Sequence, residues 1–326
     1  MQHGSADFRL LNRYQHGFPL VSQPFAAIGR EEGLSEAAVL DTYRRLSRDG
    51  VVSRIGAVFP PRRLGASTLA AVTVPDDQIE SAAAIINRHA AVNHNYQREH
   101  ELKLWFVVTA ADATARDAVL AEIAAGTGAE VLSLPLLDAF HIDLGFDLQG
   151  GAKRVGGGQC HPAPPLEAGA RRLIEVLQEG LPLVPRPYAR LAGAAGLDES
   201  AAIRLLSGWQ EDGTVKRLGV VVHHRELGYT ANAMCVWDVP DALVAELGPR
   251  LAAANGVTLC YRRQRALPRW RYNLFCMIHG RTREAVLAQR AALAVTLGLD
   301  AYGHDVLFSL RRFKQRGARY VGPAHG

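Results

Sequence analysis

The chain has 326 residues, 48% of them hydrophobic and 21% charged, a composition typical of globular proteins with apolar cores and a length that suits two or more domains. No uncharged apolar run approaches the roughly 18 residues that span a bilayer, and the four cysteines form no C-x-x-C pair, so we expect a cytoplasmic protein with reduced thiols and no membrane contact. The formal net charge of +5 favours an anionic partner, either nucleic acid or a small molecule with several carboxylates or phosphates.

The first part of the chain predicts a winged helix-turn-helix. Short helices are expected over 7–16 and 24–32, and a longer helix over 34–50, where apolar residues recur at helical spacing. The stretch "VVSRIGAVFP" that follows predicts a small β-wing. We therefore assign residues 1–66 to a winged helix-turn-helix.

The residues after the wing predict a ferredoxin-like sandwich. From 67 to 148 the pattern is strand, helix, two strands, helix and strand, which is the βαββαβ order of that fold. A stretch rich in glycine and proline follows. Because it shows no apolar period, we predict a flexible linker over 149–166.

The second half of the chain repeats the first. "HGFPLVSQPFAAIGREEGLSEAAVL" aligns with "EGLPLVPRPYARLAGAAGLDESAAI", and "RDGVVSRIGAVF" aligns with "EDGTVKRLGVVV". The repeat predicts a second winged helix-turn-helix over 167–229 and a second sandwich over 230–326. The expected fold is therefore α+β, a tandem repeat of winged helix-turn-helix plus ferredoxin-like βαββαβ sandwich. Sandwiches of this type often pair through their sheets, so the two units could form an internal pseudo-dimer, and a homodimer is a further option.

Polar residues occupy one face of a predicted strand in "HNYQREHELKLWFVV", which begins at His94. Since side chains alternate along a strand, His94, Tyr96, Arg98 and His100 are expected to share a face. The solvent-facing side of a half-buried sheet would explain the same pattern. Histidine and tyrosine are unusual on a sheet face that only contacts solvent, so the pattern favours a binding or catalytic site.

The second copy of this stretch, "CYRRQRALPRWRYNLFCMI", is rich in arginine. Tyr261, Arg263 and Arg265 are expected on one face, and Arg262 adds a further guanidinium. Guanidinium groups bind carboxylates through two parallel hydrogen bonds, and nearby tryptophans such as Trp105 offer apolar surface for a flat ligand. The same set would suit a phosphate backbone, and a solvated basic hairpin is the remaining alternative.

The starts of the two recognition helices argue against DNA binding. Glu36 in the first unit, and Asp198 and Glu199 in the second, stand where a recognition helix would contact bases. Acidic side chains there favour the helix dipole, but they would repel the phosphate backbone. A DNA-binding role is weakened, although it is not removed.

Four long motifs resemble those of siroheme decarboxylases, in the fused two-unit form of the haem d1 pathway with Lrp/AsnC-like architecture: "HNYQREHELKLWFV", "CYRRQRALPRWRYNLFCMIHG", "FHIDLGFDL" and "RRFKQRGARY". The first unit resembles the D-type subunit and the second the L-type. Leu102 and Lys103 stand where the family more often has Tyr-Asn, a pair that the second unit retains as Tyr272 and Asn273.

The resemblance implies a carboxy-lyase that removes the carboxyl groups of the C12 and C18 acetates of siroheme to give 12,18-didecarboxysiroheme. The implied partners are siroheme, its decarboxylated product and other haem d1 pathway proteins. No organic cofactor and no added metal are implied, because the iron is part of the substrate. In agreement, no His, Cys or acidic cluster in the sequence has metal-ligand spacing.

Roles for the motif residues follow from that reaction. His94 and His100 are candidate general acids. Arg98 and Arg263 are candidate carboxylate clamps, Arg98 in the catalytic set, and the expected substrate-binding residues are Tyr96, Trp105, Tyr261, Arg262, Arg263 and Arg265. Two alternatives remain open: a DNA-binding regulator that senses a tetrapyrrole or an amino acid, and a haem-binding scaffold in which one of the two histidines ligates iron.

Overall fold

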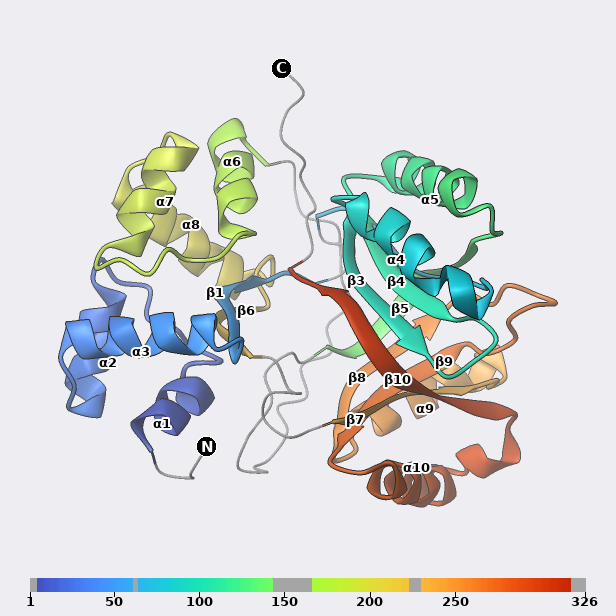
Figure 1. The fold of residues 1–326 in the computed structure, drawn as a ribbon. Coiled ribbons are helices and arrows are strands. Elements are labelled where there is room, and N and C mark those ends of the chain that lie inside the picture. Colours follow the sequence, from blue (N-terminus) through green and yellow to red (C-terminus); the bar gives the residue numbers. More distant parts are fainter. Residues whose placement is uncertain (1–4, 61–63, 143–165, 223–229, 318–326) are drawn as a thin grey trace.

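The structure, a computed structural model, describes residues 5–60, 64–142, 166–222 and 230–317, which form two parts that lie side by side (Figure 1). One part is a pair of winged helices, and the other is a closed β-barrel with helices around it. The predicted α+β fold class is confirmed. The predicted linker over 149–166 falls, except for Leu166, outside the described residues.

Capping residues set the ends of the helices in the winged-helix pair. Ser35 Oγ accepts a hydrogen bond from the backbone N–H of Ala38 (3.1 Å) and so begins α3, and Asp198 begins α8 in the same way. Gly33 ends α2 at a φ of 68°, in the left-handed region that favours glycine. The first winged helix contains α1 (Ala6–Arg13), α2 (Pro24–Glu32), α3 (Glu36–Arg48) and β1 (Val52–Val58); the second contains α6 (Ala168–Leu177), α7 (Pro187–Ala195), α8 (Glu199–Glu211) and β6 (Arg217–Val222).

The two winged helices form a single body. Strand β1 pairs antiparallel with β6, so each wing supplies one strand of a shared two-stranded sheet. Their cores are also continuous, because Phe25 and Tyr43 of the first unit lie in the same apolar cluster as Tyr188 and Trp209 of the second. The sequence predicted a wing in each unit, and the structure shows that the two wings pair with each other.

The barrel is built from the two βαββαβ repeats. Each repeat forms a four-stranded antiparallel sheet, and the two sheets close on each other in the order β10-β3-β4-β2-β5-β8-β9-β7. The strands are β2 (Ala66–Val72), β3 (Val92–Arg98), β4 (Leu104–Ala110), β5 (Leu132–Ile142), β7 (Ala231–Trp237), β8 (Val257–Arg263), β9 (Leu274–Gly280) and β10 (His304–Gln315).

The last strand of each repeat joins the two sheets. The first half of β5 pairs with β2 of its own sheet, and residues from Leu136 onward pair with β8 of the other. Strand β10 does the reverse, pairing first with β7 and then, from Ser309, with β3. These two long strands leave neither sheet with a free edge at the junction, and the expected pseudo-dimer is therefore formed within one chain.

Helices cover the outside of the barrel, and the interior divides into two zones. Helices α4 (Ile79–Arg88) and α5 (Ala113–Thr127) pack on the first sheet, and α9 (Asp241–Ala253) and α10 (Arg283–Leu297) on the second. Inside, an apolar cluster that includes Trp105, Trp270 and Phe275 fills one zone. The other zone carries the polar residues described below. Among the described helices, none has both the length and the apolar character that crossing a bilayer requires.

Candidate active site

A cavity of about 320 Å³ lies between the apolar zone of the barrel and the paired wings. Its lining comes from strands of both sheets, includes Trp105 and Phe275 of the apolar zone, and takes residues such as Val58 and Val222 from β1 and β6. This volume falls within the range of about 300–1,000 Å³ that small-molecule sites usually have. The site is therefore shared by both repeats and by both parts of the molecule.

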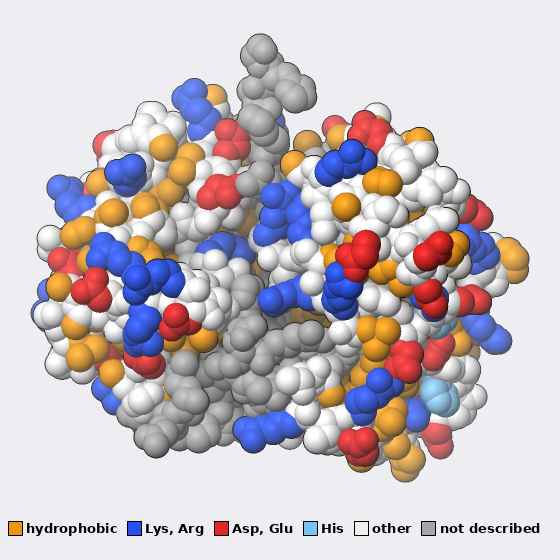
Figure 2. All heavy atoms as spheres, in the orientation of Figure 1, with side chains coloured by type: hydrophobic (Ala, Val, Ile, Leu, Met, Phe, Trp, Pro, Cys, Tyr) orange, Lys and Arg blue, Asp and Glu red, His pale blue; other side chains and the backbone are white. Residues whose placement is uncertain are grey.

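The charged side chains in the described lining of the cavity are all positive. The described lining includes five arginines and two histidines but no aspartate, glutamate or lysine. The five are Arg54, Arg98, Arg263, Arg312 and Arg316, called the cavity arginines below. Figure 2 shows Lys and Arg side chains gathered where the winged-helix half meets the barrel half. Because the described lining contributes five guanidinium groups and no carboxylate, the cavity suits a ligand with several negative charges.

Two of the cavity arginines are related by the internal repeat. Arg98 donates from Nη1 to the carbonyl oxygen of Leu307 (2.9 Å), and Arg263 donates from Nη1 to that of Leu134 (3.0 Å). Each arginine thus reaches the last strand of the other repeat. Each also lies over a tyrosine of its own strand, with Cζ at 5.9 Å from the Tyr96 ring centre and at 5.1 Å from that of Tyr261.

Burial makes the charge of these two arginines costly. Their exposed fractions are 7% for Arg98 and 8% for Arg263, and burial lowers the pKa of each to about 10. Neither forms an ion pair with any described residue, and the Nε of each is buried without a hydrogen-bond partner there. A bound carboxylate would supply the missing acceptor and the missing charge.

His94 lies in the same cavity as a neutral imidazole. Its ring is stacked 6.4 Å from that of Tyr96, and it forms no side-chain hydrogen bond with the described residues. Burial, and then the positive charge of Arg54, lower the pKa of His94 to about 4. The imidazole becomes an effective acid at neutral pH only if a bound anion offsets these two effects.

The sequence analysis missed four of the arginine and histidine residues of the lining. His279 on β9 shares a 2.9 Å hydrogen bond between its Nδ1 and Thr258 Oγ1. His279 belongs to the second quoted motif, and its side chain should face the same way as Phe275 and Met277 because side chains alternate along a strand. This alternation could have placed His279 inside the barrel. Arg312 and Arg316 stand in the "RRFKQRGARY" motif but received no role. Arg54 lies in the wing, where no local pattern points to a barrel cavity.

His100 lies away from the cavity, and the expectation that it shares a face with His94 is wrong. The alternation stops because β3 ends at Arg98, so His100 belongs to the turn before β4. Its Nδ1 accepts a hydrogen bond from the Leu102 N–H (3.0 Å), its Nε2 lies 3.5 Å from Asp305 Oδ2, and its ring packs 5.7 Å from that of Trp270. Trp105, by contrast, does line the cavity.

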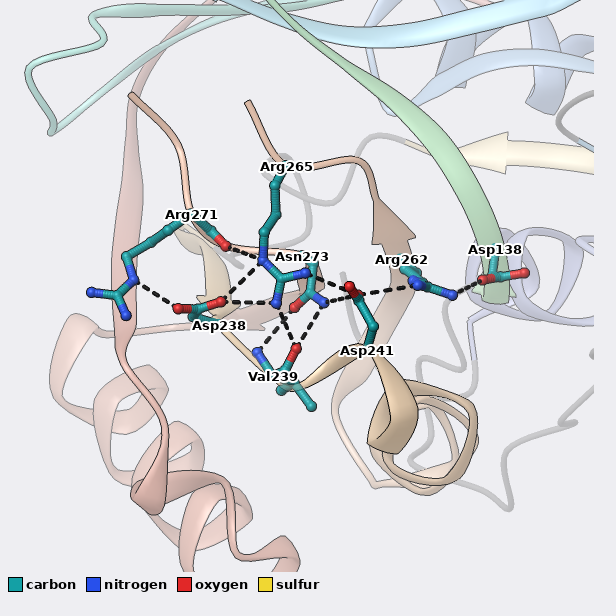
Figure 3. Close-up of polar contacts among 8 residues, drawn as sticks. All are labelled: Asp138, Asp238, Val239, Asp241, Arg262, Arg265, Arg271 and Asn273. Atoms are coloured by element: carbon teal, nitrogen blue, oxygen red, sulfur yellow. Dashed lines mark hydrogen bonds and ion pairs between the residues drawn. The ribbon is translucent and has the colours of Figure 1, made fainter. Parts of the chain in front are cut away.

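Arg262 and Arg265 also lie outside the cavity, in an ion-pair network (Figure 3). Arg262 lies on the opposite face of β8 from Arg263. Its Nη1 lies 3.4 Å from Asp138 Oδ2, and its Nη2 lies 3.1 Å from Asp241 Oδ1. Because β8 ends at Arg263, Arg265 follows the hairpin instead of the strand face. The structure thus does not place these two arginines in the cavity lining, where the sequence analysis expected them. Tyr96, Tyr261, Arg98 and Arg263 do line the cavity.

A closed barrel of two βαββαβ sheets, with a cavity lined by arginine and residues of the paired wings, defines a two-unit AsnC-like protein. Family models agree: the AsnC-like ligand binding domain matches residues 63–141 and 226–314, and the siroheme decarboxylase NirDL-like HTH domain matches residues 7–52 and 170–215. The chain belongs to the siroheme decarboxylase NirDL family, which confirms the resemblance found in its motifs.

Full-length relatives support this assignment. The siroheme decarboxylase NirDL subunit of Paracoccus denitrificans (strain Pd 1222) is 42% identical over 312 residues, 96% of each chain. A crystal structure of the siroheme decarboxylase NirDL matches with a TM-score of 0.70 at 28% identity, covering 98% of this chain and 95% of that one. A second, in co-complex with an iron-uroporphyrin III analogue, matches with a TM-score of 0.68 at 27% identity, covering 97% and 93%.

Proposed function

We propose that this chain is a siroheme decarboxylase of haem d1 biosynthesis, which removes the carboxyl groups of the C12 and C18 acetates to give 12,18-didecarboxysiroheme. The observation that carries the proposal is the cavity, whose described lining has five arginines and no acidic residue. Siroheme is a flat macrocycle with eight carboxylates, so it offers the negative charge that this lining suits. Family membership and the porphyrin-analogue complex of a solved relative support the same substrate class.

In this proposal Arg98 and Arg263 hold carboxylates of the bound macrocycle. Their guanidinium groups are buried and have no acid partner among the described residues, so a carboxylate gains charge-assisted hydrogen bonds there without displacing an existing ion pair. The rings of Tyr96, Tyr261 and Trp105 supply apolar surface beside the clamps. Clamping an acetate away from water also favours release of its carboxyl group as neutral CO₂, because the negative charge then passes to the macrocycle.

The reaction consumes one proton for each acetate. Cleavage of the bond between the methylene and the carboxylate releases CO₂ and leaves an electron pair, which a protonated macrocycle can accept. Protonation of the methylene carbon then gives a methyl group. The net change is R–CH₂–COO⁻ plus H⁺ to R–CH₃ plus CO₂. We include no separate cofactor, since the protonated ring of the substrate is the electron sink and its iron belongs to it.

His94 is the residue we assign to deliver that proton. It lies in the cavity beside Tyr96 and the cavity arginines, and it is neutral while the cavity holds no anion. Substrate carboxylates raise its proton affinity, so that it becomes a general acid in the complex. His100 has no place in this step because it does not reach the lining.

Anaerobic incubation with siroheme, followed by mass spectrometry of the pigment, tests the proposal. We expect the wild-type protein to yield a product lighter by two CO₂ units. His94→Gln should keep binding, seen as a shift of the visible bands, but lose product. His100→Gln is the matched control and should retain the reaction. Binding without CO₂ loss in the wild type would instead indicate a haem-binding scaffold, and loss of product only in His100→Gln would refute the assignment of His94.

The DNA-binding alternative has less support than the enzyme. Both wings are used in the shared β1–β6 sheet, and Glu199 at the start of α8 pairs with Arg186 and accepts a 3.0 Å hydrogen bond from Ser22 Oγ of the first unit. These contacts occupy surfaces that a winged helix needs for the phosphate backbone.

A further inference from the structure

Two polar clusters of the cavity lining are related by the internal repeat. Each consists of three side chains, one from each of three neighbouring strands. The first triad is Asn93 on β3, Thr109 on β4 and Ser67 on β2, and the second triad is Thr258 on β8, His279 on β9 and Asn232 on β7. In each triad the last two members lie directly opposite each other in the sheet. The barrel therefore contains the same arrangement twice.

A β-bulge turns the first member of each triad toward the cavity. Strict alternation would put Asn93 on the opposite face of β3 from His94, yet both line the cavity. The same holds for Thr258 and Leu259 on β8. The register of β3 against β4 shifts across Asn93, and that of β8 against β9 shifts across Thr258. A bulge of this kind re-aims a side chain, and here both repeats have it at the same position.

Hydrogen bonds link the first triad but leave one acceptor unfilled. Asn93 Nδ2 donates to Thr109 Oγ1 (3.5 Å), and Thr109 Oγ1 donates to Ser67 Oγ (3.3 Å). Asn93 is only 4% exposed, and its Oδ1 is buried without a hydrogen-bond partner among the described residues. A buried polar atom in this state opposes folding unless a ligand supplies the missing contact.

The second triad has the same feature with different side chains. Thr258 Oγ1 shares its hydrogen bond with His279 Nδ1, and it is Asn232 whose Oδ1 is buried without a partner in the described part of the chain. These groups can also donate, because a half-turn of an amide exchanges its oxygen and its N–H₂, and a hydroxyl proton rotates. Each triad can therefore bind one more polar group.

Two triads match a substrate that loses two carboxyl groups. A half-turn about the line through C5 and C15 exchanges the C12 and C18 acetates of siroheme, whereas the substituents of the other two rings do not match under it. The two repeats are likewise related by an approximate half-turn, because β5 pairs with β8 as β10 pairs with β3. A macrocycle that lies across this axis presents one of the two acetates to each repeat.

The side chains of the triads suit a carboxylate that is about to leave. Apart from His279 they are uncharged amides and hydroxyls. A guanidinium stabilises a charged carboxylate, and this contact is lost as neutral CO₂ forms, so it favours the ground state over the transition state. Hydrogen bonds from uncharged groups fix the acetate in position with less stabilisation of the ground state.

We propose that the two triads bind the two acetates that react, one acetate on each triad, while Arg98 and Arg263 hold carboxylates that the product keeps. This inference rests on the proposed function and assigns the position of its reacting groups. Both acetates are therefore bound at the same time, one by each repeat.

The experiment compares Asn93→Leu and Asn232→Leu in the full chain, each checked for folding by circular dichroism and thermal melting. Leucine keeps the branched shape and removes the amide of one triad. Asn95→Leu is the matched control, because Asn95 is a buried asparagine of the same strand that lies outside the cavity lining. Ser67→Ala and Thr258→Val, which remove one hydroxyl from each triad, replace an asparagine variant that does not fold.

After anaerobic incubation with siroheme, mass spectrometry counts the CO₂ units lost, and NMR of the iron-free pigment identifies the acetate that remains. We expect each triad variant to slow the loss of one acetate at least about tenfold, with a different acetate slowed in each. Affinity for iron-uroporphyrin III, titrated by its visible bands, should stay within about threefold of wild type because both arginine clamps are intact. Asn95→Leu should lose both acetates at the wild-type rate.

Wild-type loss of both carboxyl groups in both triad variants would overturn this inference and leave the proposed function intact. Retention of the same acetate in both variants, or an equal slowing in Asn95→Leu, would overturn it as well. A wild-type protein that releases no CO₂ from siroheme would instead refute the proposed function, and this inference with it.

Discussion

Arg98 and Arg263 are buried arginines that have no acidic partner among the described residues. Each keeps its charge in a buried position, and the described residues give each of them a carbonyl acceptor but no carboxylate. Burial of a charge without a counter-ion opposes folding, whereas the same charge strengthens binding of an anion. Such a residue is better explained by the ligand than by the fold.

Arg263→Met should therefore weaken porphyrin binding without lowering stability. The methionine fills much of the same volume and removes the unneutralised charge, so we expect the free energy of unfolding of the ligand-free protein to stay equal or to rise by about 1 kcal/mol. Affinity for iron-uroporphyrin III should fall at least about tenfold. Urea unfolding and visible-band titration measure the two quantities, with the exposed Arg250→Met as control. A joint loss of stability and affinity would mean that Arg263 serves the fold.

The depressed pKa of His94 predicts a stability that depends on pH. The ordinary value is 6.5 and the value in the folded protein is about 4, so the unfolded chain takes up the proton first as pH falls. Stability is therefore complete above about pH 6.5 and is lost between there and about pH 4, by about 2 kcal/mol at pH 5. Urea unfolding at pH 7.5 and 5.0 should show this loss in the ligand-free wild type and not in His94→Gln. The exposed His304→Gln should behave as the wild type; an unchanged loss in His94→Gln would contradict the assignment.

The hairpin between β8 and β9 is longer than its counterpart between β3 and β4 in the first repeat. Its insertion around "ALPRW" brings Trp270 into the apolar zone, where its ring centre lies 4.9 Å from that of Trp105. The network of Figure 3 holds the base of this hairpin: Arg265 donates to Asp238 and Asp241, and Arg271 donates to Asp238. Arg265, which the sequence analysis assigned to substrate binding, thus positions this hairpin. Trp270 of the hairpin helps to fill the barrel beside the cavity.

Removing Arg265 should loosen this hairpin. Burial alone would raise the pKa of Asp238, but hydrogen bonds from Arg271 and Arg265 lower it, and those from Arg265 and Asn273 lower that of Asp241. We expect Arg265→Gln to cost about 1–2 kcal/mol at pH 7, measured by urea unfolding. Because both folded-state pKa values are depressed, the difference from wild type should shrink as pH falls below about 4. Arg269→Gln, which breaks a more exposed pair with Glu130, should change stability by less than about 0.5 kcal/mol. Equal effects of the two variants would argue against the network.

At the scale of the whole molecule, the two repeats are interlocked. Pairings β1–β6, β5–β8 and β10–β3 all join one repeat to the other, and the cavity takes Arg98 from the first and Arg263 from the second. Neither half has a closed barrel or a complete lining without its partner. The site is therefore a property of the assembled pseudo-dimer.

Separate chains of residues 1–148 and 167–326 should reassemble when they are co-expressed. We expect a 1:1 complex by size exclusion that binds iron-uroporphyrin III, because the pairings between the repeats do not need a covalent connection. Each half expressed alone should fail to bind, since it lacks one of the two buried clamps. Wild-type affinity in a single half would show that one repeat suffices to build the site.

Local patterns in the sequence determined the elements, the repeat and the α+β class. Capping residues such as Ser35, helical spacing and strand alternation are properties of neighbouring residues, so they could be read along the chain. Alternation also brought His94, Tyr96 and Arg98 together on one face correctly. It failed at His100 and Arg265, because each strand ends before them.

Only the tertiary structure decided where the site lies. The closure of the barrel depends on pairing between strands more than a hundred residues apart, β10 with β3 and β5 with β8, for which no local signal exists. That closure brings Arg312 and Arg316 into the cavity, and the packing of the wings against it brings Arg54. Alternation along a strand predicts on which face of the sheet a side chain lies. Whether that face lines a cavity depends on the distant segments that pack against it.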